Sequence, residues 1–290
     1  MSTLSVITPS FGPDFDLCAA LHASVLAHSP QSVRHHIIVP QRDLALFRRL
    51  AGPRAQIHVE TDFLPRSFRS LPLLNVSVNL RRPFPPLRGW ILQQIIKLAA
   101  AARSDADVVV VVDSDIEFIR PFTADTFRRD GAVSFYRRPG AVDERLPRHL
   151  TWHRRGRSLL GLPPGTPPFP DYISSLMAWD PVIVRALLDR VEATTGRRWA
   201  DAIGAELHFS EWTLYGLFVD EILGPPPGSR TTDDALCHTY WDEIPLDHRS
   251  LAKFLAETGP DDIAVMISAK SRTPIGVRRE GFARFAAHRG

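Results

Sequence analysis

The chain has 290 residues, of which 44% are hydrophobic and 23% are charged, and its formal net charge is +3 at pH 7. This composition excludes a globally disordered chain, because it supplies enough apolar side chains to build a core. The two cysteines, Cys18 and Cys237, lie far apart in the sequence. They exclude both a disulfide framework and a cysteine-based zinc site.

Strand and helix patterns alternate through the first part of the chain. We expect strands at Leu4–Thr8, His35–Val39, Ala55–Glu60 and Val108–Val112, and helices at Asp14–His28, Asp43–Leu50 and Trp90–Arg103. The proline-rich stretch Phe63–Leu87 is expected to be mostly loop. Five consecutive valines are apolar on both faces, which is typical of a central strand in a parallel sheet covered by helices. The alternation predicts an α/β fold built from βαβ units.

The rest of the chain is less regular. We expect strands at Val133–Tyr136, Tyr172–Trp179, Ala235–Trp241 and Ile263–Ala269, and helices at Ser210–Leu223, at His248–Glu257 and from Asp180-Pro181 onward. The stretch Arg137–Pro170, which holds seven arginines by Arg157, is expected to be a long loop, and the breaker GPPPG follows Leu223. Because no internal repeat or linker is evident, we expect a single domain over residues 1–290.

The segment VVVVVDSDIEF places two carboxylates at the end of the valine strand. Asp113 and Asp115 are two residues apart, so they project to the same side while Ser114 points the other way. Ligands bind at this carboxyl end of the strands in open α/β sheets. Neighbouring carboxylates repel each other unless a cation lies between them, so the pattern favours a Mg²⁺ or Mn²⁺ site. The alternative is that both aspartates only end the strand in a turn.

The longer segment VVVVVDSDIEFIRPF resembles the DxD segment of GT-A-type nucleotide-sugar glycosyltransferases. Four other stretches, ITPSFGPDF, GWILQQIIKL, HFSEWTLYG and ISAKSRTPIG, are similar to a bacterial group of that class, so the resemblance covers nearly the whole chain. It implies a Rossmann-like GT-A fold, with a nucleotide-binding half at residues 1–120 and a variable acceptor half at 121–290. It also implies a nucleoside-diphosphate-sugar donor, whose diphosphate Mn²⁺ or Mg²⁺ bridges to Asp115 and Asp113.

The end of the first strand is expected to contact the donor. By the resemblance, Thr8, Pro9 and Ser10 lie where GT-A enzymes hold the nucleoside, and Asp14 or Asp16 would meet the ribose or the base. The alternative is that the residues from Ser10 to Asp14 only cap the following helix.

Other candidate donor contacts carry amide, hydroxyl or positively charged groups. Gln93, Gln94 and Lys97 share one polar stripe of the helix before the DxD, and Gln94 and Lys97 either face the donor or belong to a solvated surface. Lys270 and Arg272 are candidates to clamp the diphosphate, or else belong to an ordinary basic tail. Ser114 is grouped with these donor-binding residues.

Catalysis and metal binding need further side chains. Glu211 follows the predicted N-cap Ser210, and by the resemblance it would act as the general base that deprotonates the acceptor. The alternative is a carboxylate that only stabilises the helix dipole. Asp171 and Asp180 are rival carboxylates. His238 is the candidate third metal ligand, or a hydrogen-bonded histidine of a strand.

The predicted activity is therefore metal-dependent, hexosyltransferase-type transfer, with inversion or retention left open. One alternative is a haloacid-dehalogenase-like phosphatase or phosphotransferase with Asp113 as nucleophile, although Ile116-Glu117 depart from that family's pattern. Another is a noncatalytic nucleotide-sugar-binding protein. The acceptor is open. The arginines of 137–157 could meet an anionic glycan or lipid or close over the donor, or they only form a solvated surface. Nucleic acid is not expected.

The location of the protein is predicted from segments that the sequence lacks. It shows no signal-peptide pattern and no apolar run long enough for a transmembrane segment. We therefore expect a cytoplasmic protein, with peripheral association at the inner membrane face as an alternative.

Overall fold

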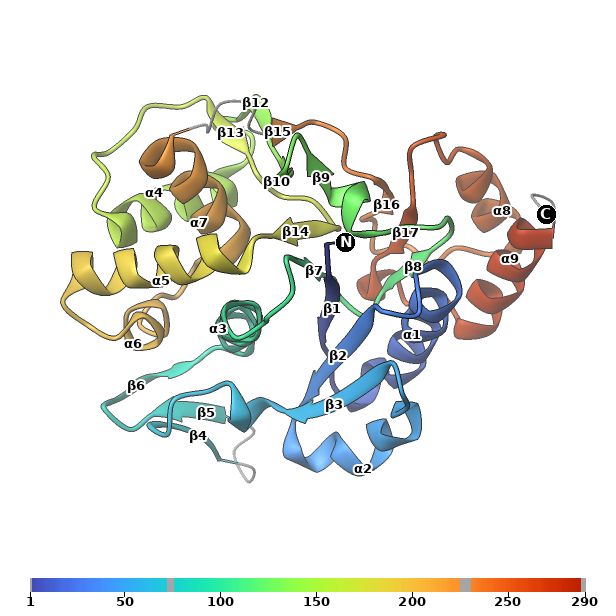
Figure 1. The fold of residues 1–290 in the computed structure, drawn as a ribbon, viewed down its shortest axis with the longest axis horizontal. Coiled ribbons are helices and arrows are strands. Elements are labelled where there is room, and N and C mark those ends of the chain that lie inside the picture. Colours follow the sequence, from blue (N-terminus) through green and yellow to red (C-terminus); the bar gives the residue numbers. More distant parts are fainter. Residues whose placement is uncertain (1, 72–75, 225–230, 288–290) are drawn as a thin grey trace.

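The computed structural model describes residues 2–71, 76–224 and 231–287. Its centre is a five-stranded sheet in the order β14-β7-β1-β2-β3 (Figure 1). These strands are β1 (Leu4–Pro9), β2 (Arg34–Val39), β3 (Ala55–Val59), β7 (Val108–Val111) and β14 (Met177–Trp179). Strands β7, β1, β2 and β3 pair in parallel, whereas β14 pairs antiparallel with β7. The expected mixed α/β fold with a mostly parallel central sheet is confirmed.

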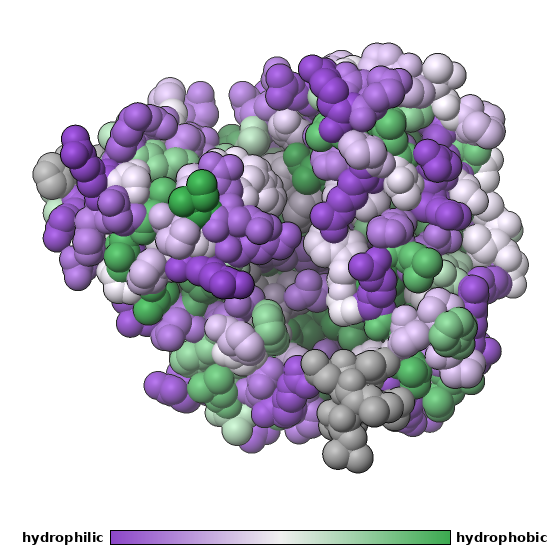
Figure 2. Space-filling model, turned by 180° about the vertical axis from the view of Figure 1, so that it is seen from behind, coloured by the Kyte–Doolittle hydropathy of each residue, from purple (hydrophilic) through white to green (hydrophobic). Residues whose placement is uncertain are grey.

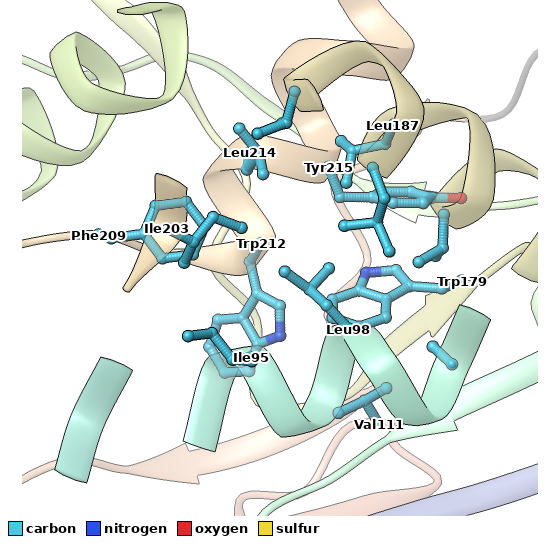
Figure 3. Close-up of a cluster of buried hydrophobic side chains, with 14 of the residues drawn as sticks. Ile95, Leu98, Val111, Trp179, Leu187, Ile203, Phe209, Trp212, Leu214 and Tyr215 are labelled. Atoms are coloured by element: carbon cyan, nitrogen blue, oxygen red, sulfur yellow. The ribbon is translucent and has the colours of Figure 1, made fainter. Parts of the chain in front are cut away.

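Strand β7 is buried on both faces, as its valines predict. Its odd-numbered valines belong to the hydrophobic cluster that includes α3 (Gly89–Ala102) and α5 (Pro181–Thr195), and its even-numbered valines belong to a cluster with α1 (Phe15–His28). Figure 3 shows part of the first cluster, in which Leu98 of α3 lies beside Trp179 of β14. Successive side chains of a strand alternate between its faces, so an all-valine strand needs apolar cover on both.

A second sheet carries the C-terminal part of the chain. Strands β16 (Cys237–Tyr240), β17 (Ala264–Ile267) and β8 (Ile116–Phe118) form it in that order. Helices α8 (His248–Ala256) and α9 (Ile275–Ala287) share a hydrophobic cluster with β17. Strand β8 follows the DxD directly, so this sheet brings the C-terminal segments close to the end of β7.

The prediction of loop for Phe63–Leu87 is wrong. Strands β4 (Phe68–Leu71), β5 (Val76–Asn79) and β6 (Arg82–Leu87) form an antiparallel sheet there. Three of the segment's prolines, Pro83, Pro85 and Pro86, lie in β6, which is an edge strand, where a missing backbone N–H does not break the ladder.

The prediction of a long loop at Arg137–Pro170 is also wrong. Strand β12 (Arg138–Val142) pairs with β13 (Phe169–Asp171), and helix α4 (Pro147–Leu160) lies between them in the sequence. Helix α4 begins with Pro147 and is followed by the C-cap Gly161, whose φ is +69°. Both are ordinary helix boundary signals, and the many arginines obscured them.

Other elements are short. They include α2 (Leu44–Phe47), α6 (Trp199–Ile203), α7 (Glu211–Leu217), β9 (Arg128–Arg129), β10 (Ala132–Val133), β11 (Phe135–Tyr136) and β15 (Thr231–Thr232). Helix α7 continues as a π-helix over Phe218–Leu223. The predicted helix Ser210–Leu223 is therefore confirmed, although its second half is a π-helix instead of an α-helix. The predicted strand Tyr172–Trp179 is shorter, because only β14 is extended there. Most of the GPPPG breaker falls on 225–230, outside the described residues.

Hydrophilic side chains predominate on the face shown in Figure 2, with hydrophobic residues scattered among them. Among the helices of the described residues, none has the length and apolar character needed to cross a lipid bilayer.

A histidine pair at β2 and β3 makes stability depend on pH. His36 Nδ1 lies 3.1 Å from His58 Nε2, and burial together with the charges of His58 and Arg34 lowers the pKa of His36 to about 4. The unfolded chain therefore binds this proton more readily, so stability falls as pH drops below about 6.5. Through His36, the free energy of unfolding of the wild type should fall by about 2 kcal/mol between pH 7 and pH 5. We expect His36→Gln to lack this part of the decrease.

Urea unfolding of both proteins at the two pH values measures this difference. The half-exposed His248 provides the matched control, since His248→Gln leaves the pair intact. An unchanged pH dependence in the His36 variant would contradict the assignment.

Candidate active site

A cleft of about 660 Å³ lies at the carboxyl ends of β1 and β7. One group of its lining residues follows strands of the two sheets: Pro9, Phe11, Asp14, Asp113, Ser114, Asp115, Trp241, Ser268, Ala269 and Lys270. Another group lies in or next to α3, α4, β13 and the start of α7: Trp90, Gln93, Arg148, His149, Trp152, Asp171, Ile173, Ser210 and Trp212. Helices α4 and α7 lie on the same side of the central sheet (Figure 1). The cleft therefore combines segments from both halves of the chain.

The two aspartates of the DxD line this cleft in different environments. Asp113 Oδ1 lies 2.9 Å from Lys97 Nζ, and its side chain is 48% exposed. Asp115 Oδ2 accepts a 2.9 Å hydrogen bond from the backbone N–H of Ala269. Burial and the neighbouring charge of Asp113 raise the pKa of Asp115 to about 6. Between them, Ser114 Oγ donates to Ser10 Oγ at 2.8 Å and joins the ends of β7 and β1.

Lys97 connects the DxD to α7. Its Nζ lies 2.9 Å from Asp113 Oδ1 and 3.2 Å from Glu211 Oε1, and 4.9 Å from the ring centroid of Trp212. The side chain is only 6% exposed. Burial by itself would lower the pKa of Lys97, but the two carboxylates outweigh burial and raise it. Lys97 is therefore a charged group inside the protein, held by two anionic partners.

The polar stripe of α3 is not a solvated surface. Gln94 is 2% exposed, and its Oε1 accepts a 2.9 Å hydrogen bond from the backbone N–H of Glu211. Together with Lys97, it fixes the start of α7 to α3, just behind Asp113. Gln93, one residue earlier, does line the cleft.

Glu211 lies at the predicted helix start, but its carboxylate is not free. Ser210 is the N-cap, since its Oγ accepts from the backbone N–H of Thr213 at 3.3 Å. Glu211 is 3% exposed and pairs with Lys97. Burial raises its pKa and the charge of Lys97 opposes that shift. Glu211 is therefore bound to Lys97 and is not among the residues that line the cleft, which argues against its predicted role as general base.

Of the rival carboxylates, Asp171 lines the cleft. Its Oδ1 lies 3.4 Å from His149 Nδ1 and accepts a 3.1 Å hydrogen bond from the backbone N–H of Ile173. Asp180 instead caps α5, because its Oδ1 accepts from the backbone N–H of Val182.

Several predicted site residues do not line the cleft. Thr8 is fully buried, and its hydroxyl lies 2.9 Å from His35 Nε2. Arg272 is exposed at the left-handed end of a short 3-10 helix. His238 stacks on Phe254 of α8 at 4.2 Å between ring centroids. Their chain positions are close to cleft residues, but their side chains are directed elsewhere.

Other predicted positions do reach the cleft. Pro9, Asp14 and Lys270 line it, and Lys270 Nζ lies 3.9 Å from Glu243 Oε1. Asp16 lies outside it and pairs with Arg279 at 2.9 Å.

The predicted three-residue metal set is not assembled. Within residues 2–71, 76–224 and 231–287, no three His, Cys, Asp or Glu side chains come together as metal ligands. His238 therefore does not join Asp113 and Asp115. The two aspartates alone still fit a divalent cation, because Mg²⁺ commonly takes one or two protein carboxylates and completes its shell with water and substrate phosphate.

The sequence of residues 1–256 matches a family of unknown function (DUF6492). The chain belongs to the DUF6492 family. No curated protein matches it. The matched residues include the DxD, Lys97, Glu211 and all the cleft residues of α3, α4 and α7, whereas Ser268, Ala269 and Lys270 lie beyond the match.

Arg278 of this DUF6492 protein was not predicted from the sequence. Arg278 is 2% exposed, and its guanidinium donates to the backbone carbonyl of Ile267 at 2.7 Å and that of Ser268 at 3.3 Å. Its charge partly opposes the burial that raises the pKa values of Asp115 and Asp14. No local pattern distinguishes Arg278 from its neighbour Arg279, and only the packing of α9 buries it.

The aromatic residues of the cleft were missed as well. Trp90, Trp152, Trp212 and Trp241 all line it. Tryptophan spacing alone gave no signal, because these residues come from separate elements. Trp152 lies on α4, a helix that was expected to be loop.

Proposed function

We propose that this DUF6492 protein is a metal-dependent glycosyltransferase that moves a sugar from a nucleoside-diphosphate-sugar donor to an acceptor. The observation that carries the proposal is the place of Asp113 and Asp115. Both follow a buried parallel strand and line one large cleft at the sheet end where α/β proteins bind ligands. The Rossmann-like GT-A fold and the cytoplasmic location are part of this proposal.

The charges of the cleft support a cation. The raised pKa values of Asp14 and Asp115 both have burial as their first cause and repulsion from Asp113 as their second. A divalent cation beside Asp113 and Asp115 would relieve this repulsion. When bound, Mn²⁺ or Mg²⁺ supplies charge that neutralises the diphosphate leaving group.

The chain's own residues would bind the donor, position the site and accept the acceptor proton. Pro9 and Ser114 line the part of the cleft assigned to the nucleoside, and Lys270 offers its ammonium to the diphosphate. Lys97 and Gln94 hold Asp113 and the start of α7 in place. We assign the general base to the His149–Asp171 pair, because this pair lines the cleft while Glu211 is already bound to Lys97.

A thermal-shift experiment tests the donor site. We expect UDP or GDP to raise the melting temperature more with Mn²⁺ than with EDTA, because a ligand that binds only the folded state stabilises it by about 2.7 kcal/mol at 100 Kd. Asp115→Asn should remove the part of this rise in melting temperature that depends on Mn²⁺. The variant loses a negative charge but keeps an acceptor for the N–H of Ala269. Asp125→Asn, on the exposed surface, is the matched control. Equal stabilisation in EDTA would contradict the metal site.

Turnover separates the enzyme classes. We expect slow, Mn²⁺-dependent hydrolysis of one nucleotide sugar when no acceptor is present. Asp113 is half-exposed and bound to Lys97, an arrangement that also suits an aspartyl nucleophile. Hydrolysis of p-nitrophenyl phosphate that is lost in Asp113→Asn would therefore favour the phosphatase alternative. Nucleotide-sugar binding without any turnover would favour a noncatalytic binding protein.

A further inference from the structure

Arg148 of α4 presents a positive charge to the cleft. It lines the cleft, and its guanidinium lies 5.3 Å from the ring centroid of Trp90 and 5.2 Å from that of Trp152. Among the described residues, no carboxylate forms an ion pair with it, whereas Arg145 and Arg155 of the same region pair with Asp143 and Glu206. An arginine held on aromatic rings keeps its hydrogen-bond donors available for an anion.

The two tryptophans form a fixed aromatic surface beside this charge. The rings of Trp90 and Trp152 are stacked, with centroids 6.2 Å apart and planes 12° apart. Trp90 is 43% exposed, and its Nε1 donates a 2.9 Å hydrogen bond to the carbonyl of Phe209. Behind it, Trp152 is buried and His149 stacks on it at 4.6 Å. Trp90 is therefore a large exposed aromatic side chain whose orientation is set in advance.

This combination has a definite ligand chemistry. The face of an indole ring carries partial negative charge, and the C–H groups on one face of a sugar ring carry partial positive charge. The exposed hydroxyl groups of a sugar need hydrogen-bond partners at the ring edge, and Gln93 and Asp171 line the same cleft. The unpaired guanidinium selects a carboxylate or a phosphate on that sugar.

We propose that Trp90, Trp152 and Arg148 form an acceptor subsite for an anionic carbohydrate. Trp90 stacks on the sugar ring, and Arg148 binds the anionic substituent. The subsite lies in the same cleft as Asp113 and Asp115, so a bound sugar is within one cavity with the donor. The assignment of this ligand as the acceptor rests on the proposed transferase function, whereas the binding of anionic sugar does not.

The test measures binding by isothermal titration, without turnover. The probes are trigalacturonate, which carries carboxylates, glucose 6-phosphate, which carries a phosphate, and neutral maltotriose. We expect at least one anionic probe to bind about tenfold to a hundredfold more tightly than maltotriose, because charge-assisted hydrogen bonds supply that factor. Which anionic probe binds more tightly decides between a uronic acid and a phosphorylated sugar.

Two variants locate the site. Arg148→Gln should reduce the preference for anionic sugar to about that of maltotriose, and Trp90→Ala should weaken binding of all bound sugars by about tenfold. Trp90→Phe should restore part of the loss, because it keeps an aromatic face. The matched controls are Arg155→Gln, on the same helix but outside the cleft, and Phe84→Ala, an exposed aromatic residue of β6. Both should bind as the wild type does.

Nucleotide binding distinguishes the sugar subsite from the proposed transferase function. UDP or GDP with Mn²⁺ should bind Trp90→Ala and Arg148→Gln as it binds the wild type. A drop in nucleotide affinity in Trp90→Ala would overturn the sugar subsite, because the ring would then stack on the donor's base. The absence of any preference for anionic sugar, or a preference that survives in Arg148→Gln, would overturn it too. If sugar binds as expected while nucleotide does not, the transferase proposal fails and the carbohydrate site stands.

Discussion

Lys97→Met is expected to lower the free energy of unfolding by about 3–5 kcal/mol, the usual cost of removing one partner from a buried ion pair. In the wild type, Lys97 Nζ lies 2.9 Å from Asp113 Oδ1 and 3.2 Å from Glu211 Oε1. Methionine fills much of the same space but leaves Glu211, which is 3% exposed, without a counter-charge. Asp113 is half-exposed and water solvates it after the change. Urea denaturation measures the loss.

The pH dependence and a double variant identify Glu211 as the cause. Without Lys97, burial raises the pKa of Glu211 further above its unfolded value, so the folded state binds the proton more tightly. The deficit of Lys97→Met should therefore shrink as pH falls. Lys97→Met combined with Glu211→Gln should recover much of the stability, because no buried charge remains. Lys253→Met, an exposed lysine of α8, is the matched control. A deficit that does not depend on pH and persists in the double variant would contradict this account.

Asp171→Asn is expected to lower the rate of sugar transfer by about 100- to 10,000-fold, the range that a general base contributes. Asp171 lies 3.4 Å from His149 in the cleft, and asparagine keeps its shape while removing the negative charge. In an inverting transfer, the acceptor O–H would give its proton to this pair as its oxygen bonds to the sugar carbon and the nucleoside diphosphate leaves with the bonding electrons. Nucleotide affinity should stay unchanged, because the donor is held by other residues. Steady-state kinetics and titration of UDP or GDP with Mn²⁺ measure the two effects.

Two further variants decide which carboxylate acts as the general base. Asp180→Asn keeps an N-cap for α5 and lies outside the cleft, so its transfer rate should be normal. Glu211→Gln should affect stability, through Lys97, more than the rate measured on folded protein. If Glu211→Gln abolished transfer in a folded enzyme while Asp171→Asn remained active, the base would be Glu211 and our assignment would be wrong.

Local patterns in the sequence were sufficient for the parts of the fold that depend on neighbouring residues. The valine run predicted β7, and the Asp180-Pro181 and Ser210 signals predicted two helix starts that the structure confirms. These features depend on side-chain alternation and on capping, which act over a few residues. The many arginines of α4 and the prolines of β6 led to a prediction of loop in both segments, and that prediction was wrong.

The sequence by itself determined that two carboxylates follow a buried strand of an α/β fold. Only the tertiary structure decided how they and the other candidates are paired. From the sequence, Lys97 could equally lie on a solvated surface, and Glu211 could do no more than stabilise the helix dipole. The packing of α7 on α3 buries the two together as an ion pair. His238 and Asp171 were both reasonable candidates, and the packing of α8 directed one away while the β12–β13 pairing brought the other into the cleft. Such pairings join residues far apart in the chain, and burial sets their energies, so no local pattern encodes them.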